Sequence, residues 1–125
     1  MTDTLNTAYK VALADADAGG GVLSLANPEG VDLFVTRVVL DVTTAATAAC
    51  TVDAGCGASA STKYDTLIDG LDVNTAVGTF DNIENQGTNG KSVVRWESDQ
   101  YLTISKATGA AAGLVGNAYI QYVRA

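Results

Sequence analysis

Hydrophobic and polar residues alternate with a period of two along most of the chain, and no segment shows a convincing period of 3.6 residues. Such alternation is typical of strands with one face toward a core and the other toward water. Clusters rich in Gly, Asn, Asp and Ser separate these segments and predict turns. The expected strands are Ala8–Leu13, Val22–Asn27, Asp32–Thr43, Ala48–Asp53, Lys63–Ile68, Asn74–Phe80, Ser92–Trp96, Tyr101–Lys106 and Leu114–Arg124.

The number and spacing of these segments predict an all-β fold, a single-domain antiparallel β-sandwich that is jelly-roll-like and has eight or nine short strands. The chain has 125 residues without a linker or an internal repeat, so we expect one domain over residues 1–125. Two interpretations stay open for residues 1–9. They form either an extended N-terminal arm or a frayed end that leads into a simple first strand.

The segment DLFVTRVVLDVT has apolar residues on both faces if it alternates regularly. One face carries Leu33, Val35 and Val39, interrupted by Arg37 and Asp41. The segment is either a central strand covered by a loop or by the N-terminal segment, or a strand whose apolar residues meet another subunit. In the second interpretation the two charged residues form a polar rim. The opposite face carries Phe34, Thr36, Val38, Leu40 and Val42.

The last expected strand sorts into two faces in the same way. Its more apolar set should face the core, which leaves Tyr119 and Gln121 pointing outward. A Tyr beside a Gln on an exposed strand suits a hydrated interface. The set expected in the core is Leu114, Gly116, Ala118, Ile120 and Tyr122.

The stretch YLTISKATGAAAGLVGNAYIQYV predicts a hairpin between the last two strands. Leu102 and Ile104 are expected to pair with Ile120 and Tyr122 in its core. Its tip of Ala and Gly would offer a low-profile surface that another protein could approach closely.

The formal net charge of −7, from 14 acidic and 7 basic residues, excludes several partners. Nucleic acid and acidic membrane surfaces are both poor partners, since binding them needs clustered Lys and Arg. The chain contains no apolar run of about 20 residues, and its first residues lack the features of a signal peptide. We therefore expect synthesis in the cytoplasm and no membrane segment.

Candidate chemistry is scarce in this sequence. No histidine is present, which removes the usual general base, the commonest metal ligand and every Ser-His or Cys-His nucleophile. The close acidic pairs Asp69 with Asp72 and Glu97 with Asp99 fall in predicted turns, where such residues usually form Asx-turns or simply lie in water. We therefore expect no enzymatic activity, no cofactor and no metal.

Two further motifs share only part of the pattern of a binding loop. Asp15 and Asp17 have the spacing of a calcium loop, but its twelfth position is Ala26 instead of a carboxylate. The glycines at 19–21 precede a predicted strand and lack the Lys of a phosphate-binding loop.

Cys50 and Cys56 are too few for a zinc site without histidine, and their spacing is too wide for a redox CxxC motif. A strand followed by a turn could bring them together as a disulfide under oxidising conditions. Two reduced thiols, with Cys50 buried, is the favoured interpretation.

The last third of the chain, VVRWESDQYLTISKATGAAAGLVGNAYIQYVRA, resembles the end of small β-sandwich proteins encoded among the head genes of tailed bacteriophages. The shared features are a Trp followed by acidic residues, a strand of YLTI type, a loop of small residues and a closing strand similar to GLVGNAYIQY. The rest of the chain is similar only in the rhythm of its strands. The family is that of capsid decoration, or cement, proteins.

This resemblance implies a structural virion protein that binds the outer surface of a phage capsid and clamps neighbouring major capsid subunits. It implies the major capsid protein and further copies of the chain, as a homotrimer, as partners. The location would be the capsid exterior, after assembly in the host cytoplasm. The candidate contact residues are Leu33, Val35, Arg37, Val39, Tyr119 and Gln121.

Two alternatives remain open beside this interpretation. The first is a tail, fibre or head-completion component of a phage. The second is a carbohydrate-binding β-sandwich module, which would use coplanar aromatic residues on one exposed face, with Trp96, Tyr101 and Tyr119 as the available set.

Overall fold

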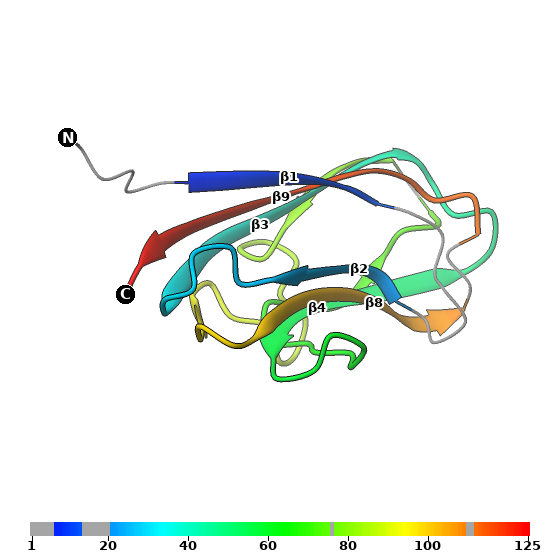
Figure 1. Cartoon of the computed structure of the whole chain (residues 1–125). Helices are drawn as coiled ribbons and strands as arrows, with labels where there is room; N and C mark the ends of the chain where they lie inside the picture. Colours follow the sequence, from blue (N-terminus) through cyan, green and yellow to red (C-terminus); the bar gives the residue numbers. More distant parts are fainter. Residues whose placement is uncertain (1–6, 14–20, 76, 110–111) are drawn as a thin grey trace.

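The computed structural model shows two antiparallel sheets packed face to face (Figure 1), and it describes residues 7–13, 21–75, 77–109 and 112–125. These residues form nine strands, and no helix among them is long and apolar enough to cross a membrane. The strands are β1 Thr7–Leu13, β2 Gly21–Ala26, β3 Leu33–Thr44, β4 Cys50–Gly57, β5 Ile68–Asp72, β6 Gly78–Asp81, β7 Val94–Trp96, β8 Tyr101–Gly109 and β9 Val115–Arg124.

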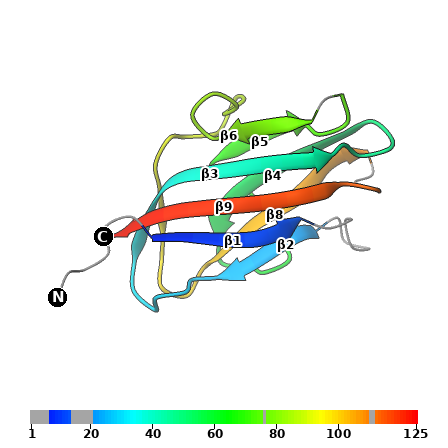
Figure 2. The same ribbon diagram turned by 90° about the horizontal axis from the view of Figure 1, so that it is seen from above.

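The strand order is that of a jelly roll. The first sheet, sheet A, has the order β1-β9-β3-β6, and the short β7 also pairs with β3. The second sheet, sheet B, has the order β2-β8-β4-β5. Without β7, each sheet has four strands, and the chain crosses repeatedly between the two sheets, as in two joined Greek keys. The predicted all-β sandwich is confirmed, and Figure 2 shows sheet A lying in front of sheet B.

The core lies between the sheets and is built from the inward side chains of both. Trp96 is its largest fully buried residue, and its indole Nε1 donates to the carbonyl oxygen of Gln100 at 3.1 Å. Its ring meets Tyr122 edge-on, with 6.3 Å between the ring centroids. The Tyr122 hydroxyl donates to Glu29 at 2.9 Å, so the polar atoms of both aromatic residues are satisfied.

A β-bulge in β3 corrects the predicted face assignment of that strand. Val35 pairs with Tyr122 and Arg37 with Gln121, so Thr36 is one extra residue in β3. The bulge inverts the alternation, because odd-numbered residues face the core before it and even-numbered residues face the core after it. Leu33 and Val35 are each 0% exposed, and they are core residues instead of the predicted contact residues. Val38, Leu40 and Val42 continue the buried face beyond the bulge.

The predicted hairpin between the last two strands is wrong, although its core residues are correct. β8 pairs with β2 and β4 in sheet B, whereas β9 pairs with β1 and β3 in sheet A. Leu102 and Ile104 therefore face Ile120 and Tyr122 across the sandwich, and all four are buried. The set predicted to face the core on the last strand is buried as expected.

The small residues of the β8–β9 connection pack against this chain's own β3–β4 connection. Gly109 has a φ of +76°, and a Cβ there would overlap the carbonyl oxygen of Ala49. The amide of Thr47 donates to the carbonyl oxygen of Ala112 at 2.9 Å. The close approach that we predicted for a partner protein is made here within the molecule. Residues 110–111 of this tip lie outside the described residues, as do residues 1–6 of the expected arm.

Candidate interaction surface

The outer face of sheet A is the main candidate for contact with another protein. Directly opposed residues of neighbouring strands share one face, so the pairing register identifies its members. On β9 the even-numbered residues from Gly116 to Tyr122 are buried, and the odd-numbered ones point outward. No described segment lies over this face (Figures 1 and 2). Its members are Lys10, Ala12, Phe34, Arg37, Val39, Asp41, Thr44, Thr79, Asp81, Arg95, Val115, Asn117, Tyr119, Gln121 and Val123.

Four of the predicted contact residues meet at the centre of this face. Arg37 lies opposite Gln121, and Val39 lies opposite Tyr119, on the paired strands β3 and β9. We call these four residues the central patch. Arg37 is exposed, and the other three are partly exposed. The sequence therefore predicted the middle of the surface, while the bulge removed Leu33 and Val35 from it.

An ion pair fixes the charged side of the central patch. Arg37 Nη2 lies 2.5 Å from Asp81 Oδ2 on the neighbouring strand β6. Burial disfavours the ionised form of Asp81, but hydrogen bonds from the Glu84 amide, Arg37 and the Ile83 amide outweigh it, so the pKa of Asp81 is lowered. The guanidinium is therefore held beside Val39, and the patch presents a positioned cation next to apolar surface.

A second apolar and cationic pair lies at the start of β3. The guanidinium of Arg95 stands 4.9 Å from the ring centroid of Phe34, and it also pairs with Asp32 at 3.2 Å. Regular alternation in the sequence predicts that Phe34 faces the core, because this pattern does not reveal the bulge. In the structure Phe34 lies on the outer face instead. Aromatic and Arg residues are enriched in protein interfaces, so this pair extends the candidate surface.

The chain itself covers the part of the outer face of sheet B that β4 and β8 form. The segment 58–67 was predicted to include a strand at Lys63–Ile68, but the strand β5 begins only at Ile68. This segment lies over the sheet instead, where Thr103 Oγ1 donates to the Thr62 carbonyl oxygen at 2.9 Å. Side chains at Gly55 and Gly57 would overlap Thr66 and the ring of Tyr64. The glycines of β4 therefore make room for this cover.

The aromatic set required for a carbohydrate site is not assembled. Trp96 is 0% exposed and belongs to the core. Tyr101 is on β8 in sheet B, and Tyr119 is on β9 in sheet A. These three rings share no exposed face, so they cannot form a stacking platform for a sugar.

Of the acidic pairs singled out in the sequence, Asp69 and Asp72 cap backbone amides in the structure. Asp72 accepts hydrogen bonds from Thr75 Oγ1 at 2.6 Å and from the Asn74 amide at 2.8 Å. Asp69 accepts one from the Asn89 backbone amide, whereas Glu97 accepts one from the side-chain amide of Gln100. Within the described ranges no group of three His, Cys, Asp or Glu residues could hold a metal ion. Asp15 and Asp17 lie outside those ranges.

Both cysteines are free and buried on β4. The strand is continuous from Cys50 to Gly57, so no turn brings the two thiols together. Six residues of extended chain separate them by about 20 Å, whereas a disulfide needs Cα atoms about 4–7 Å apart. Burial raises the pKa of Cys56 to about 12 and also raises the pKa of Cys50. Both residues therefore act as small apolar core side chains.

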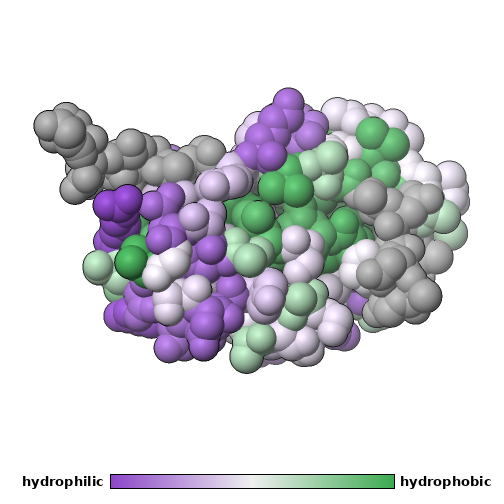
Figure 3. All heavy atoms as spheres, viewed as in Figure 1, coloured by the Kyte–Doolittle hydropathy of each residue, from purple (hydrophilic) through white to green (hydrophobic). Residues whose placement is uncertain are grey.

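Apolar side chains also gather along the edge of the sandwich between β1 and β2 (Figure 3). Val11 on β1 and Leu25 on β2 are partly buried there against the core. Tyr9 is 37% exposed and stacks on Tyr122, with 6.2 Å between the centroids. β1 and β2 are edge strands of their sheets, so this seam borders backbone groups that no neighbouring strand pairs in the described part of the chain.

The fold and the surface together define a jelly-roll β-sandwich with one sheet face that no described segment covers. Viral capsid domains, lectin domains and cupins share this architecture. Among solved structures, a chain of the "Capsid of Ralstonia phage GP4" has a similar fold, with a TM-score of 0.63. The alignment covers 100% of this chain and 89% of that chain at 20% sequence identity, which establishes similarity of fold. Neither a family model nor a curated protein sequence matches the chain.

Proposed function

We propose that this protein is a structural component of a phage virion, a decoration protein without enzymatic activity. It binds the outer surface of the capsid and clamps neighbouring major capsid subunits. The observation that carries this proposal is the fold similarity to a chain of a phage capsid structure, which extends over the whole length of this chain. The resemblance of the last third of the sequence to decoration proteins is the reason for proposing this role among capsid components.

The proposed mechanism is mechanical stabilisation. A protein that binds the assembled shell, but not the dispersed subunits, stabilises the shell by mass action. Contacts repeated by the symmetry of the shell add up, so each of them can be modest. A sandwich with a partly apolar sheet face suits this role, since its strands hold the contact residues rigidly in place.

The central patch is the proposed contact between copies of the chain, in a homotrimer on the capsid exterior. Val39 and Tyr119 supply apolar area, while Arg37 and Gln121 supply hydrogen bonds at the rim. The major capsid protein is the second partner, and assembly takes place in the host cytoplasm.

The test combines sedimentation with electron microscopy. The purified protein is mixed with expanded shells of the phage that encodes it, and separately with dispersed major capsid subunits. We expect it to sediment with the shells only, to raise the temperature at which they disassemble, and to appear as density on their exterior. Equal binding to dispersed subunits, or density confined to the tail or the portal vertex, would contradict a decoration role. The second result would favour a tail, fibre or head-completion component.

A further inference from the structure

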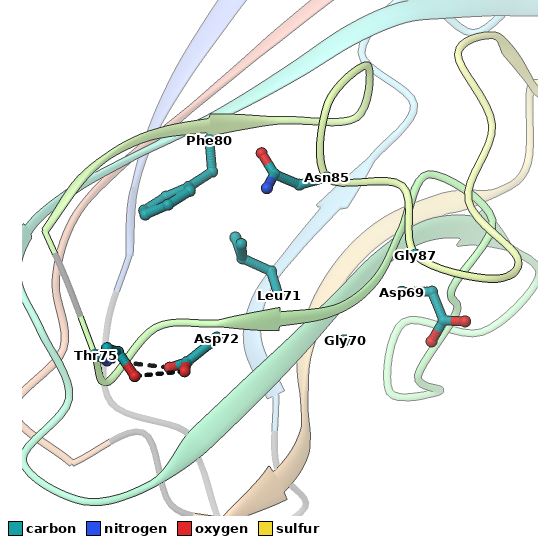
Figure 4. A pocket seen from close by; sticks show the side chains of 8 residues that line it. All are labelled: Asp69, Gly70, Leu71, Asp72, Thr75, Phe80, Asn85 and Gly87. Carbon is teal, nitrogen blue, oxygen red and sulfur yellow. Dashed lines mark hydrogen bonds between the residues drawn. The ribbon is translucent and has the colours of Figure 1, made fainter.

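An open slot of about 400 Å³ lies between β5 of sheet B and β6 of sheet A. Phe80 and Leu71 point toward each other from these two strands and form its apolar middle (Figure 4). Asp72 and Thr75 lie at one end of the slot, and Asp69 lies at the other end beside Gly87. The volume falls within the range of about 300–1,000 Å³ that is usual for ligand cavities.

The apolar middle of the slot remains accessible because both strands are at the edges of their sheets. Leu71 is buried, whereas Phe80 is only partly buried although it packs against the core. A ring that has core contacts on one side and a cavity on the other offers a face to a ligand. Apolar groups and flat cations are the partners that suit such a face.

The end of the slot at Asp72 is acidic (Figure 4). The hydroxyl of Thr75 and the amides of Asn74 and Thr75 donate to Asp72, which lowers the pKa of this carboxyl and keeps it ionised. Asp69 lies at the far end with its carboxylate directed away from Phe80 and Leu71 (Figure 4), and Asp65 lies close to it, since both accept hydrogen bonds from Asn89. The described residues that line the slot include no Lys or Arg. A ligand with one positive charge and an apolar stem matches this arrangement.

We propose that the slot binds an arginine side chain presented by an extended segment of a partner protein. The aliphatic stem lies along Leu71, the guanidinium stacks on the ring of Phe80, and its charge faces Asp72. Arg fits these three features better than Lys does, because its planar group stacks on aromatic rings and pairs with carboxylates through several donors. The slot is separate from the outer face of sheet A, so the chain has two contact sites.

The direct test is a titration of the ¹⁵N-labelled protein, followed by NMR, with N-acetyl-arginine amide. We expect saturable shifts of the amide resonances of Leu71, Thr75 and Phe80. N-acetyl-citrulline amide has the same shape without the charge, and it should give no saturable shifts. A titration with MgCl₂ at the same concentration of positive charge shows whether the site binds any cation or only a cationic side chain. Equal effects of citrulline or of Mg²⁺ at these resonances would overturn the proposal.

Two variants with the same change of charge locate the binding. Asp72→Asn keeps an oxygen for the Asn74 and Thr75 amides, and we expect it to weaken arginine binding roughly threefold to tenfold. Asp99→Asn changes an exposed acid that does not line the slot, and it should leave binding unchanged. Equal weakening by both variants would mean attraction to the acidic surface as a whole and would overturn the proposal. Shell binding is measured separately, so either proposal can fail without the other.

Discussion

At the scale of single residues, the acidic side chains of this protein differ widely in environment. Asp53 is only 4% exposed on sheet B, and one of its oxygens accepts a hydrogen bond from the Gly70 amide at 2.7 Å. Burial raises the pKa of this carboxyl, the bond from Gly70 opposes the shift, and the charges of Asp69 and Asp65 add to it, while Lys63 opposes it. The fold therefore disfavours the ionised form of Asp53.

The pKa of Asp53 leads to a prediction about stability and pH. The pKa of Asp53 is higher in the folded protein than in the unfolded chain. Protonated Asp53 therefore contributes to the stability of the fold below the unfolded pKa of about 3.9, and this contribution is lost as the pH rises through the folded pKa. We expect Asp53→Asn to raise the melting temperature by a few degrees at pH 7, since Asn keeps an oxygen for the Gly70 amide.

The difference in melting temperature between Asp53→Asn and the parent protein should become smaller toward pH 3.5, where Asp53 is protonated in the folded parent. Thermal unfolding monitored by circular dichroism at both pH values measures this, with the exposed Asp99→Asn as the control. A variant that is less stable than the parent at pH 7 would show that the fold needs the charge.

The buried thiols give a second prediction at this scale. With the pKa of Cys56 raised to about 12, almost no thiolate exists near neutral pH. We expect the folded protein to react with Ellman's reagent far more slowly than the protein in denaturant, where both Cys50 and Cys56 should react. Rapid modification of either cysteine in the folded protein would contradict their placement in the core.

At the scale of elements, β3 and β9 form the central pair of sheet A and approach very closely at one point. Gly116 lies opposite Val42 of β3 and Leu13 of β1, with its Cα directed toward the buried side. A Cβ at this position would overlap the backbone carbonyl of Asp41. Backbone atoms in a paired strand cannot move aside as a flexible side chain can.

We predict that Gly116→Ala destabilises the fold by about 2 kcal/mol or more, because the two strands must separate to admit the methyl group. Chemical denaturation measures the change in the free energy of unfolding. Gly30→Ala is the matched control, since Gly30 has a φ of +70° but a Cβ added there would meet nothing within 4 Å. Its cost should be about 1 kcal/mol, from backbone strain alone. Equal losses in the two variants would show that steric overlap is not the cause.

At the scale of the whole molecule, the chain's own 58–67 segment covers part of the outer face of sheet B, whereas no described segment covers that of sheet A (Figure 1). The uncovered face combines the central patch with the Phe34–Arg95 pair. An uncovered face that mixes apolar, aromatic and Arg residues is typical of an interface. Self-association through this face follows as an expectation.

We predict that the purified protein is a trimer at micromolar concentration, and that Val39→Asp weakens self-association at least about tenfold, because an unpaired carboxylate would be buried in the contact. Light scattering measures the mass, and circular dichroism checks that the variant folds. Val31→Asp places the same charge on a residue that is 47% exposed and lies in the connection between β2 and β3, and it should not change the mass.

Two results would contradict the trimer or its location. A parent protein that is monomeric at this concentration would refute self-association. If Val39→Asp fails to fold, Tyr119→Ala tests the same contact, and an unchanged mass in that variant would place the interface elsewhere.

Part of the candidate surface could be predicted from the sequence, because Arg37, Val39, Tyr119 and Gln121 lie beyond the bulge or on a regular strand, where alternation is reliable. Leu33 and Val35 were assigned to the same surface by extending this alternation across Thr36. A single bulged residue exchanges the two faces for the residues of the strand that precede it. The sequence gives little indication that a bulge is present. The slot between β5 and β6 had no sequence signal, since its lining residues come from strands of different sheets.

The sequence by itself determined that the chain forms strands, which residues of the last strand face the core, and that the chain carries an acidic excess without histidine. These properties depend on local periodicity and on composition. Only the tertiary structure decided which strands are neighbours, where β3 bulges, which sheet face the 58–67 segment covers and where the slot opens. Pairing partners in a jelly roll are far apart in the chain, so their register depends on contacts that no local pattern encodes.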